Sequence, residues 1–271
     1  MPDSGIATLA PVAGLAVTLA DGVLSLTIDR PDSLNSLIIP VISGLADATE
    51  RAATDPLVKV VRLGGTGRGF CSGAGIAADD MSSTGGAPPD DIILEINRLI
   101  LAITAVPHPV VAVVHGPAAG VGVSLALACD VVLASDKAFF MLAFTKIGLM
   151  PDGGASALVA ANIGRIRAMR MALLAERLPA DEALAAGLVS AVYPADEFDA
   201  KVDKVVASLA AGPAVALART KDAINAATLT ELHTALQREL EGQSKLLQAP
   251  DFKEGTAAFQ AKRAANFSDT L

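Results

Sequence analysis

The sequence predicts a mixed α/β fold with a helical C-terminal region. Residues 110–114 (VVAVV) are apolar and mostly β-branched, which is typical of a buried strand, whereas residues 90–105 place apolar side chains at helical spacing. Strand and helix patterns alternate in this way until about residue 198, after which nearly every pattern is helical. We therefore expect an α/β core over residues 1–200 and a C-terminal helical region over residues 201–271.

Composition excludes several classes of protein. The net charge of −8 argues against a nucleic-acid-binding surface. Pro107, Pro109 and Pro117 interrupt the longest apolar stretch, so no segment has the pattern of a membrane span, and the start of the chain lacks a basic signal-peptide region. Cys71 and Cys129 lie in apolar settings and indicate reduced core thiols rather than a disulfide framework, which favours a cytoplasmic protein.

Turn residues and alternation define the first half of the chain. Asp21 and Gly22 separate two alternating runs and predict a β-hairpin. Pro31 removes a backbone donor and restricts the residue before it, so a loop follows the hairpin. Residues 64–75 are dense in glycine and predict a loop. The other expected elements are strands at 15–19, 23–29 and 58–63 and helices at 39–53 and 90–105.

The segment 110–130 is the centre of the prediction. A buried strand ends at His115-Gly116-Pro117, and residues 118–128 are small and apolar, as in a closely packed helix. A glycine-lined helix start leaves N–H groups unpaired at the positive end of the helix dipole, where a phosphate, a carboxylate or an oxyanion can bind. Beyond it we expect strands at 131–134 and 139–144, a loop at 147–155, a helix from about 156, and a helix within 178–192 that Gly187 ends.

Six segments in order carry a resemblance: RPDSLNSL (30–37), GRGFCSGAGI (67–76), HPVVAVVHGPAAGVGVSLALACD (108–130), FTKIGLMPDGG (144–154), ADEALAAGLVSAV (180–192) and EGTAAFQAKRAANF (254–267). Together they resemble the crotonase (enoyl-CoA hydratase/isomerase) superfamily. The resemblance implies a crotonase-like spiral of ββα units and a C-terminal helical region that forms a homotrimer or a dimer of trimers. It also implies an acyl-CoA thioester as substrate, with no permanently bound cofactor.

The resemblance further implies an oxyanion hole for the thioester oxygen, made of the backbone N–H groups of Ala74 and Val121. Such donors stabilise negative charge where it develops, and each is worth roughly 3–4 kcal/mol of barrier. Phe259 and Lys262 match positions that contact CoA, often from a neighbouring subunit. The other positions expected to contact the substrate or CoA are Ser33, Leu34, Asn35, Gly73, Gly75, Ile76, Gly120, Ser124 and Phe144.

Asp152, in MPDGGA, is the acid expected to carry the chemistry. Hydration benefits from two carboxylates, and the positions of the two hydratase acids correspond here to Ser124 and Phe144. In the single-acid enoyl-CoA isomerases, an acid at the position of Asp152 takes a proton from C2 and returns it to C4. The resemblance therefore implies Δ3 to Δ2 enoyl-CoA isomerisation, with Asp152 expected to be buried beside a ligand held at Ala74 and Val121.

Several alternatives stay open. Asp152 could instead cap the following helix or lie in a turn, and Asp79 and Asp80 are further acids in a polar segment. The enzyme could be a hydratase with a reduced acid set, or a crotonase-fold protein that binds acyl-CoA or a partner without catalysis.

Two unrelated classes are weaker. Ser124 in GVSLA resembles a truncated nucleophile elbow, but the only later histidine is His233, in a charged helical stretch. Gly120-Val121-Gly122 lacks the third glycine of a dinucleotide-binding motif. His108, His115 and His233 have no metal-ligand spacing, so no metal site is expected.

Overall fold

A six-stranded sheet forms the centre of the computed structural model, which describes residues 5–75 and 89–270. The strand order is β1-β2-β3-β4-β6-β9. The first two strands pair antiparallel and all later neighbours pair parallel. The expected α/β fold is thus confirmed. The strands are Leu15–Ala20 (β1), Val23–Ile28 (β2), Val60–Gly65 (β3), Val110–Val114 (β4), Val131–Ser135 (β6) and Ala191–Tyr193 (β9).

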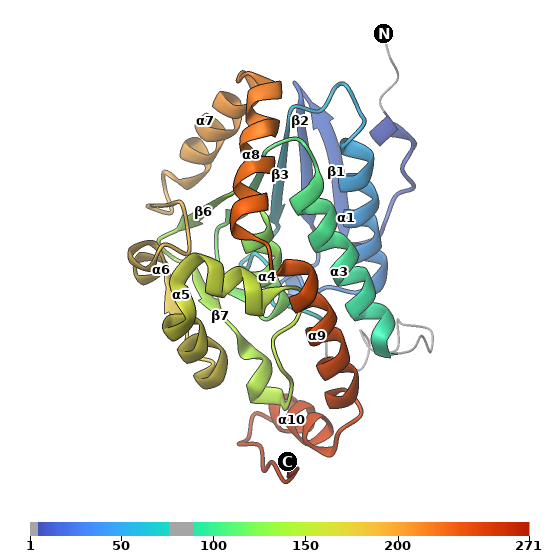
Figure 1. The fold of residues 1–271 in the computed structure, drawn as a ribbon, viewed down its shortest axis with the longest axis vertical. Helices are drawn as coiled ribbons and strands as arrows, with labels where there is room; N and C mark the ends of the chain where they lie inside the picture. Colours follow the sequence, from blue (N-terminus) through green and yellow to red (C-terminus); the bar gives the residue numbers. More distant parts are fainter. Residues whose placement is uncertain (1–4, 76–88, 271) are drawn as a thin grey trace.

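Helices cover both faces of this sheet (Figure 1). All five residues of β4 are buried, because alternate side chains point to opposite faces and each face is covered. Ala112 and Val114 belong to the core on one side, and Val111 and Val113 pack with Phe198 on the other. The first side carries Ile39–Ala52 (α1), Pro89–Ala105 (α3) and Val121–Ala128 (α4), and the second carries Phe198–Ala210 (α7).

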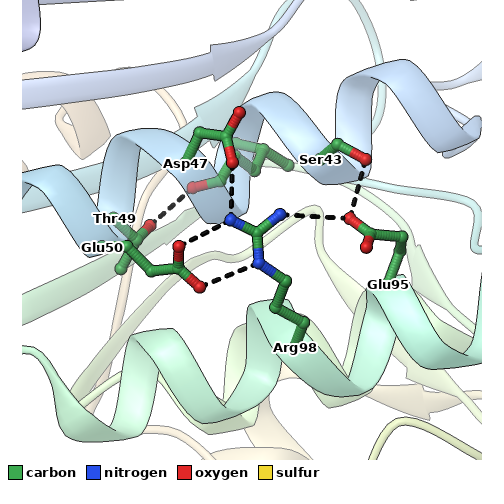
Figure 2. A network of polar contacts seen from close by, with 7 residues as sticks. Ser43, Asp47, Thr49, Glu50, Glu95 and Arg98 are labelled. Carbon is green, nitrogen blue, oxygen red and sulfur yellow. Dashed lines mark hydrogen bonds and ion pairs between the residues drawn. The ribbon is translucent and has the colours of Figure 1, made fainter.

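A charged cluster joins α1 and α3 (Figure 2). The guanidinium of Arg98 on α3 lies 2.6 Å from a carboxylate oxygen of Asp47 and 2.6 Å from one of Glu50, both on α1. Glu95, on the previous turn of α3, accepts a hydrogen bond of 2.7 Å from Ser43 Oγ. These side chains are partly exposed, so each pair adds little stability. The cluster lies between α1 and α3, and Ile96, next to Glu95 on α3, is buried in the core.

A second sheet has three short strands, and the secondary structure expected from the sequence is partly wrong for two of them. Ala118–Ala119 (β5) pairs with Phe139–Met141 (β7), which also pairs with Leu178–Pro179 (β8). The expected helix over 118–128 is wrong for its first residues, because Ala118 and Ala119 pair with β7 and the helix begins at Val121. The strand expected over 139–144 ends at Met141, since its partner strands are only two residues long; a 3₁₀ turn, Ala143–Ile147 (η3), follows.

The remaining helices lie after η3. Figure 1 shows Leu232–Leu246 (α9) beside α3, with Pro250–Gln260 (α10) at the lower end of the molecule. α9 packs on both α3 and α5, and α10 packs on η3. The expected boundary at residue 200 between an α/β core and a C-terminal helical region stays a prediction. No helix in the described part of the chain is long and apolar enough to cross a membrane. The helices are Ala155–Leu174 (α5), Ala180–Ala186 (α6), Ala214–Thr228 (α8), Leu232–Leu246 (α9) and Pro250–Gln260 (α10).

Candidate active site

The first feature of the candidate site is the backbone at Ala74. Leu37 bridges this segment in parallel: its N–H donates to the Gly73 carbonyl at 2.8 Å, and its carbonyl accepts from the Gly75 N–H at 2.9 Å. In such a bridge the residue between the two partners directs its own N–H to the opposite side. The Ala74 N–H accordingly has no hydrogen-bond acceptor among the described residues.

The second feature is the start of α4. Gly120 has φ 53° and ψ −130°, and its N–H donates to the Met141 carbonyl at 2.9 Å. Val121 is the first helical residue, so its N–H has no partner within the helix. A Cβ on Gly73 would lie 3.4 Å from the Val121 nitrogen, so the two loops touch here. The backbone near Ala74 and the helix start at Val121 therefore form one surface.

Asn35 supports the loop that leads to Ala74. Its side chain is fully buried; Oδ1 accepts from the Arg30 N–H at 2.9 Å, and Nδ2 donates to the carbonyls of Thr66 and Gly69 at 2.8 Å each. A Cβ on Gly65 would clash with this Nδ2, so position 65 at the end of β3 has room only for glycine. The side chain of Asn35 is thus fully used inside the protein, and a contact from this loop to a ligand falls to its backbone or to its neighbours.

Ser33 and Leu34 hold the same loop. The Ser72 N–H donates to the Leu34 carbonyl at 3.0 Å, and the Ser72 hydroxyl donates to the Ser33 carbonyl at 2.9 Å. The Ser33 hydroxyl donates to the Arg30 carbonyl at 3.1 Å. Both residues are partly exposed. They therefore lie against the segment before Ala74, and their expected contact with CoA stays a prediction.

The carboxyl group of Asp152 is buried, with the residue 6% exposed. Oδ2 accepts a hydrogen bond of 2.8 Å from Gln243 Nε2, and Oδ1 has no partner among the described residues. Burial raises the pKa of Asp152 to about 7, the hydrogen bond from Gln243 opposes the rise, and the charge of Glu239 adds to it. A carboxyl group in this setting can exchange a proton near neutral pH.

The loop of Asp152 lies on the first turn of α4. The Ser124 hydroxyl donates to the Asp152 carbonyl at 2.8 Å. Gly153 has φ 64°, and a Cβ there would lie 3.2 Å from Val121 Cγ2, 3.2 Å from Ser124 Cβ and 3.0 Å from Ile96 Cγ2. Asp152 is therefore next to the helix start at Val121.

The capping alternative for Asp152 is wrong. Its carboxylate bonds to no N–H group of α5 among the described residues, and Glu239 of α9 takes that role instead. Glu239 accepts from the Gly154 N–H at 2.6 Å and from the Ser156 N–H at 2.9 Å, and also from the Ser156 hydroxyl. Burial raises the pKa of Glu239, and the donors at Ser156 and Gly154 oppose the rise.

Sequence reasoning missed Glu239 and Gln243. Residues 238–245 have the composition of a charged, exposed helix face, but both side chains are 1% exposed. The signal lies in their spacing, because they continue the inward stripe that starts with Leu232 and Leu236. A polar residue on an apolar stripe needs a buried partner.

Other expected residues lie around this cluster or apart from it. Phe144 is 7% exposed, and its ring lies 3.8 Å from where a Cβ on Gly120 would be. Phe259, near the end of α10, and Lys262, just beyond it, are exposed. Figure 1 shows α10 at the lower end of the molecule and α4 near its centre. Ile76, Asp79 and Asp80 lie outside the described residues.

Neither the histidines nor the cysteines form a site in the described chain. His108 Nε2 contacts the Ala52 carbonyl at 3.1 Å, and His115 Nε2 contacts the Gly67 carbonyl at 3.1 Å. Burial raises the pKa of the Cys71 thiol to about 12, which makes it unreactive. Among residues 5–75 and 89–270, no group of three or more His, Cys, Asp or Glu side chains is arranged to hold a metal ion.

Comparison with known proteins adds an independent finding. The enoyl-CoA hydratase/isomerase family model matches residues 18–270. A Rhodobacter capsulatus protein named "Probable enoyl-CoA hydratase" is 39% identical over 250 residues, covering 92% of this chain and 96% of the relative. The 1,2-epoxyphenylacetyl-CoA isomerase of Escherichia coli is 36% identical over 249 residues, covering 91% and 95%. The crystal structure of an enoyl-CoA hydratase from Mycobacterium avium subsp. paratuberculosis is 74% identical, with a TM-score of 0.90, covering 96% of this chain and 100% of that one.

Proposed function

The chain belongs to the enoyl-CoA hydratase/isomerase family of the crotonase superfamily, and from this premise we propose that it isomerises an enoyl-CoA thioester, moving a double bond from Δ3 to Δ2. The likeness to solved structures confirms the crotonase fold expected from the sequence. Within the family, the reaction depends on which acids surround the thioester.

The observation that carries the proposal is Asp152. It is a buried acid with a pKa raised to about 7 and one oxygen without a partner in the described chain, and its loop rests on the helix start at Val121. The other two acid positions of a hydratase hold Ser124 and Phe144, which cannot act as acids near neutral pH. A single acid is enough for an isomerase, because the group that takes the proton returns it.

The mechanism follows from these positions. The N–H groups of Ala74 and Val121 bind the thioester oxygen. Asp152 removes a proton from C2, which gives a dienolate whose oxygen the two donors stabilise. The protonated Asp152 then delivers this proton to C4, and the double bond lies between C2 and C3. Proton transfer by a positioned acid of this kind contributes typically about 10²–10⁴-fold to the rate.

The CoA contacts expected of Phe259 and Lys262 would require several copies of the chain to assemble, because in the resemblance these positions often reach a neighbouring subunit. Ile166, Met169 and Leu173 in the second half of α5 form an apolar face, and Ile166 is 77% and Leu173 62% exposed in a single chain. Apolar faces of this kind are typical of subunit contacts. We propose a homotrimer or a dimer of trimers, in which Phe259 and Lys262 contact the CoA of a neighbouring subunit.

A paired assay tests the reaction. One arm follows a 3-enoyl-CoA for the conjugated product, and the other follows crotonyl-CoA for loss of conjugation; each uses wild type and Asp152→Ala. Isomerisation that disappears in Asp152→Ala supports the proposal, and isomerisation that persists rejects Asp152 as the base. Hydration that survives the substitution favours a hydratase with another acid, an alternative consistent with the names of two of the relatives. Thioester binding without turnover would indicate a non-catalytic protein.

A further inference from the structure

Glu239 and Gln243 lie one helical turn apart on α9, and both are 1% exposed. We refer to them as the α9 pair. Buried polar side chains on a helix cost free energy unless every polar atom has a partner. In the described chain, the side chains of this pair hydrogen-bond only to residues 150–156, the loop that carries Asp152.

Gln243 holds the first half of this loop in one orientation. Its Oε1 accepts from the Met150 N–H at 3.1 Å, and its Nε2 donates to Asp152 Oδ2 at 2.8 Å. The Met150 N–H can only donate, so the amide oxygen must face Met150 and the amide NH₂ must face Asp152. Oδ2 is thus an acceptor in both protonation states of Asp152, and the acidic proton must be on Oδ1.

Glu239 holds the second half. Oε2 accepts from the Gly154 N–H, and Oε1 accepts from the N–H and the hydroxyl of Ser156. Backbone N–H donors on both oxygens suit an ionised carboxylate at the N-terminus of α5. This charge disfavours ionisation of the neighbouring Asp152, whereas the bond from Gln243 favours it.

We propose that the α9 pair positions and tunes Asp152: Gln243 occupies Oδ2 so that the proton is exchanged at Oδ1, and Glu239 fixes the loop and opposes ionisation. The inference rests on the proposed function, because it assigns positioning residues to the same proton transfer. Glu239 and Gln243 are the titratable and hydrogen-bonding side chains that act on this carboxyl group in the described chain.

Two substitutions test the proposal because they should have opposite effects on the pKa of Asp152. Gln243→Glu keeps an acceptor for Met150 and brings a second carboxylate to Oδ2, which raises the pKa. Glu239→Gln removes a negative charge and lowers it. Gln243→Glu should move the acidic limb of the kcat/KM profile to higher pH by about one unit or more, which lowers kcat/KM about tenfold at a given pH on that limb. Glu239→Gln should move the same limb to lower pH.

Gln237→Glu is the matched control, because it makes the same change at an exposed position of α9. It should leave the limb in place. A second readout does not depend on turnover: the carboxyl carbon of ¹³C-labelled aspartate is titrated by NMR, with Asp152→Asn to assign the signal. If Gln243→Glu fails to fold by circular dichroism, Gln243→Leu replaces it, since loss of the donor to Oδ2 also raises the pKa.

The outcomes separate the two proposals. If the two variants shift both the pH profile of kcat/KM and the NMR titration in opposite directions, the proposed role of the α9 pair is supported. Opposite shifts in the NMR titration of a protein that does not isomerise reject the proposed reaction and retain the tuning of Asp152. The inference is overturned if the wild type is active and neither variant changes the acidic limb of kcat/KM or the titration of the Asp152 carboxyl group. It is also overturned if both variants shift these two readouts in the same direction.

Discussion

The hydroxyl of Ser124 donates a hydrogen bond of 2.8 Å to the backbone carbonyl of Asp152. Ser124 is fully buried, so this hydroxyl serves the protein and is not available as a nucleophile. Ser124, at a position where the resemblance places a hydratase acid, therefore supports the loop that carries Asp152. This relationship links the first turn of α4 to the candidate catalytic group.

Ser124→Ala should weaken this link. We expect a loss of about 1 kcal/mol of stability, because the Asp152 carbonyl loses one buried donor, and a lower kcat with little change in KM. Thermal unfolding and steady-state kinetics measure the two effects. Ser208→Ala on α7 is a suitable control. A Ser124→Ala enzyme with altered KM and unchanged kcat would indicate that the hydroxyl contacts substrate instead.

The pH dependence of activity follows from the pKa of Asp152, about 7. A general base must be ionised in the free enzyme, so kcat/KM for isomerisation should fall about tenfold per pH unit below that value. The measurement is a pH–rate profile from pH 5 to 9 with a fixed substrate. A flat profile across this range would exclude Asp152 as the rate-controlling base.

The free energy of unfolding should also depend on the protonation of Asp152, but this contribution should fall as the pH rises, whereas activity should increase. The folded-state pKa of Asp152 is raised above its ordinary value of 3.8, so between about pH 4 and 7 the folded state binds more protons than the unfolded state. This contribution is fully present at the acidic end and is lost as the pH rises. Asp152→Asn should therefore gain stability relative to wild type as the pH rises from 4 to 8, by a few kcal/mol. Denaturant unfolding at several pH values measures the difference, and a constant difference would contradict it.

Lys221 on α8 should be a large contributor to stability. Its Nζ lies 2.9 Å from Asp130 Oδ2 and donates to the carbonyls of Ile103 and His108 at 2.9 and 3.3 Å. Lys221→Met leaves Asp130 without its counter-charge in a setting where its side chain is 19% exposed, which typically costs about 3–5 kcal/mol. Arg219→Met, exposed on the same helix, should cost little. Equal effects of the two variants on unfolding would refute the role of Lys221.

The exposed apolar face of α5 should be a contact between subunits. Light scattering of the purified protein should give three or six times the chain mass of 27.4 kDa. Leu173→Asp should shift the distribution toward smaller species, because a charge is costly in an apolar contact. Lys204→Asp, on the exposed side of α7, is the control. An unchanged mass for Leu173→Asp would locate the contact elsewhere, such as the C-terminal helices.

The sequence by itself determined the fold class, the family and the candidate acid. These are properties of local pattern: the apolar run of β4, the glycines near Ala74 and Val121, and Asp152 in MPDGGA beside Ser124 and Phe144 at the two positions where the resemblance places the hydratase acids. Local pattern cannot determine which distant groups meet. For this reason sequence reasoning missed strand β5, predicted β7 too long and did not identify Glu239 as the cap of α5.

Tertiary structure alone decided the surroundings of Asp152. Glu239 and Gln243 have the composition of an exposed helix, and only the packing of α9 on α3 and α5 buries them against the loop at 150–156. Burial and two side chains about ninety residues away in the sequence set the pKa of Asp152. A pKa depends on solvation and on charges close in space, which are fixed only when the chain has folded.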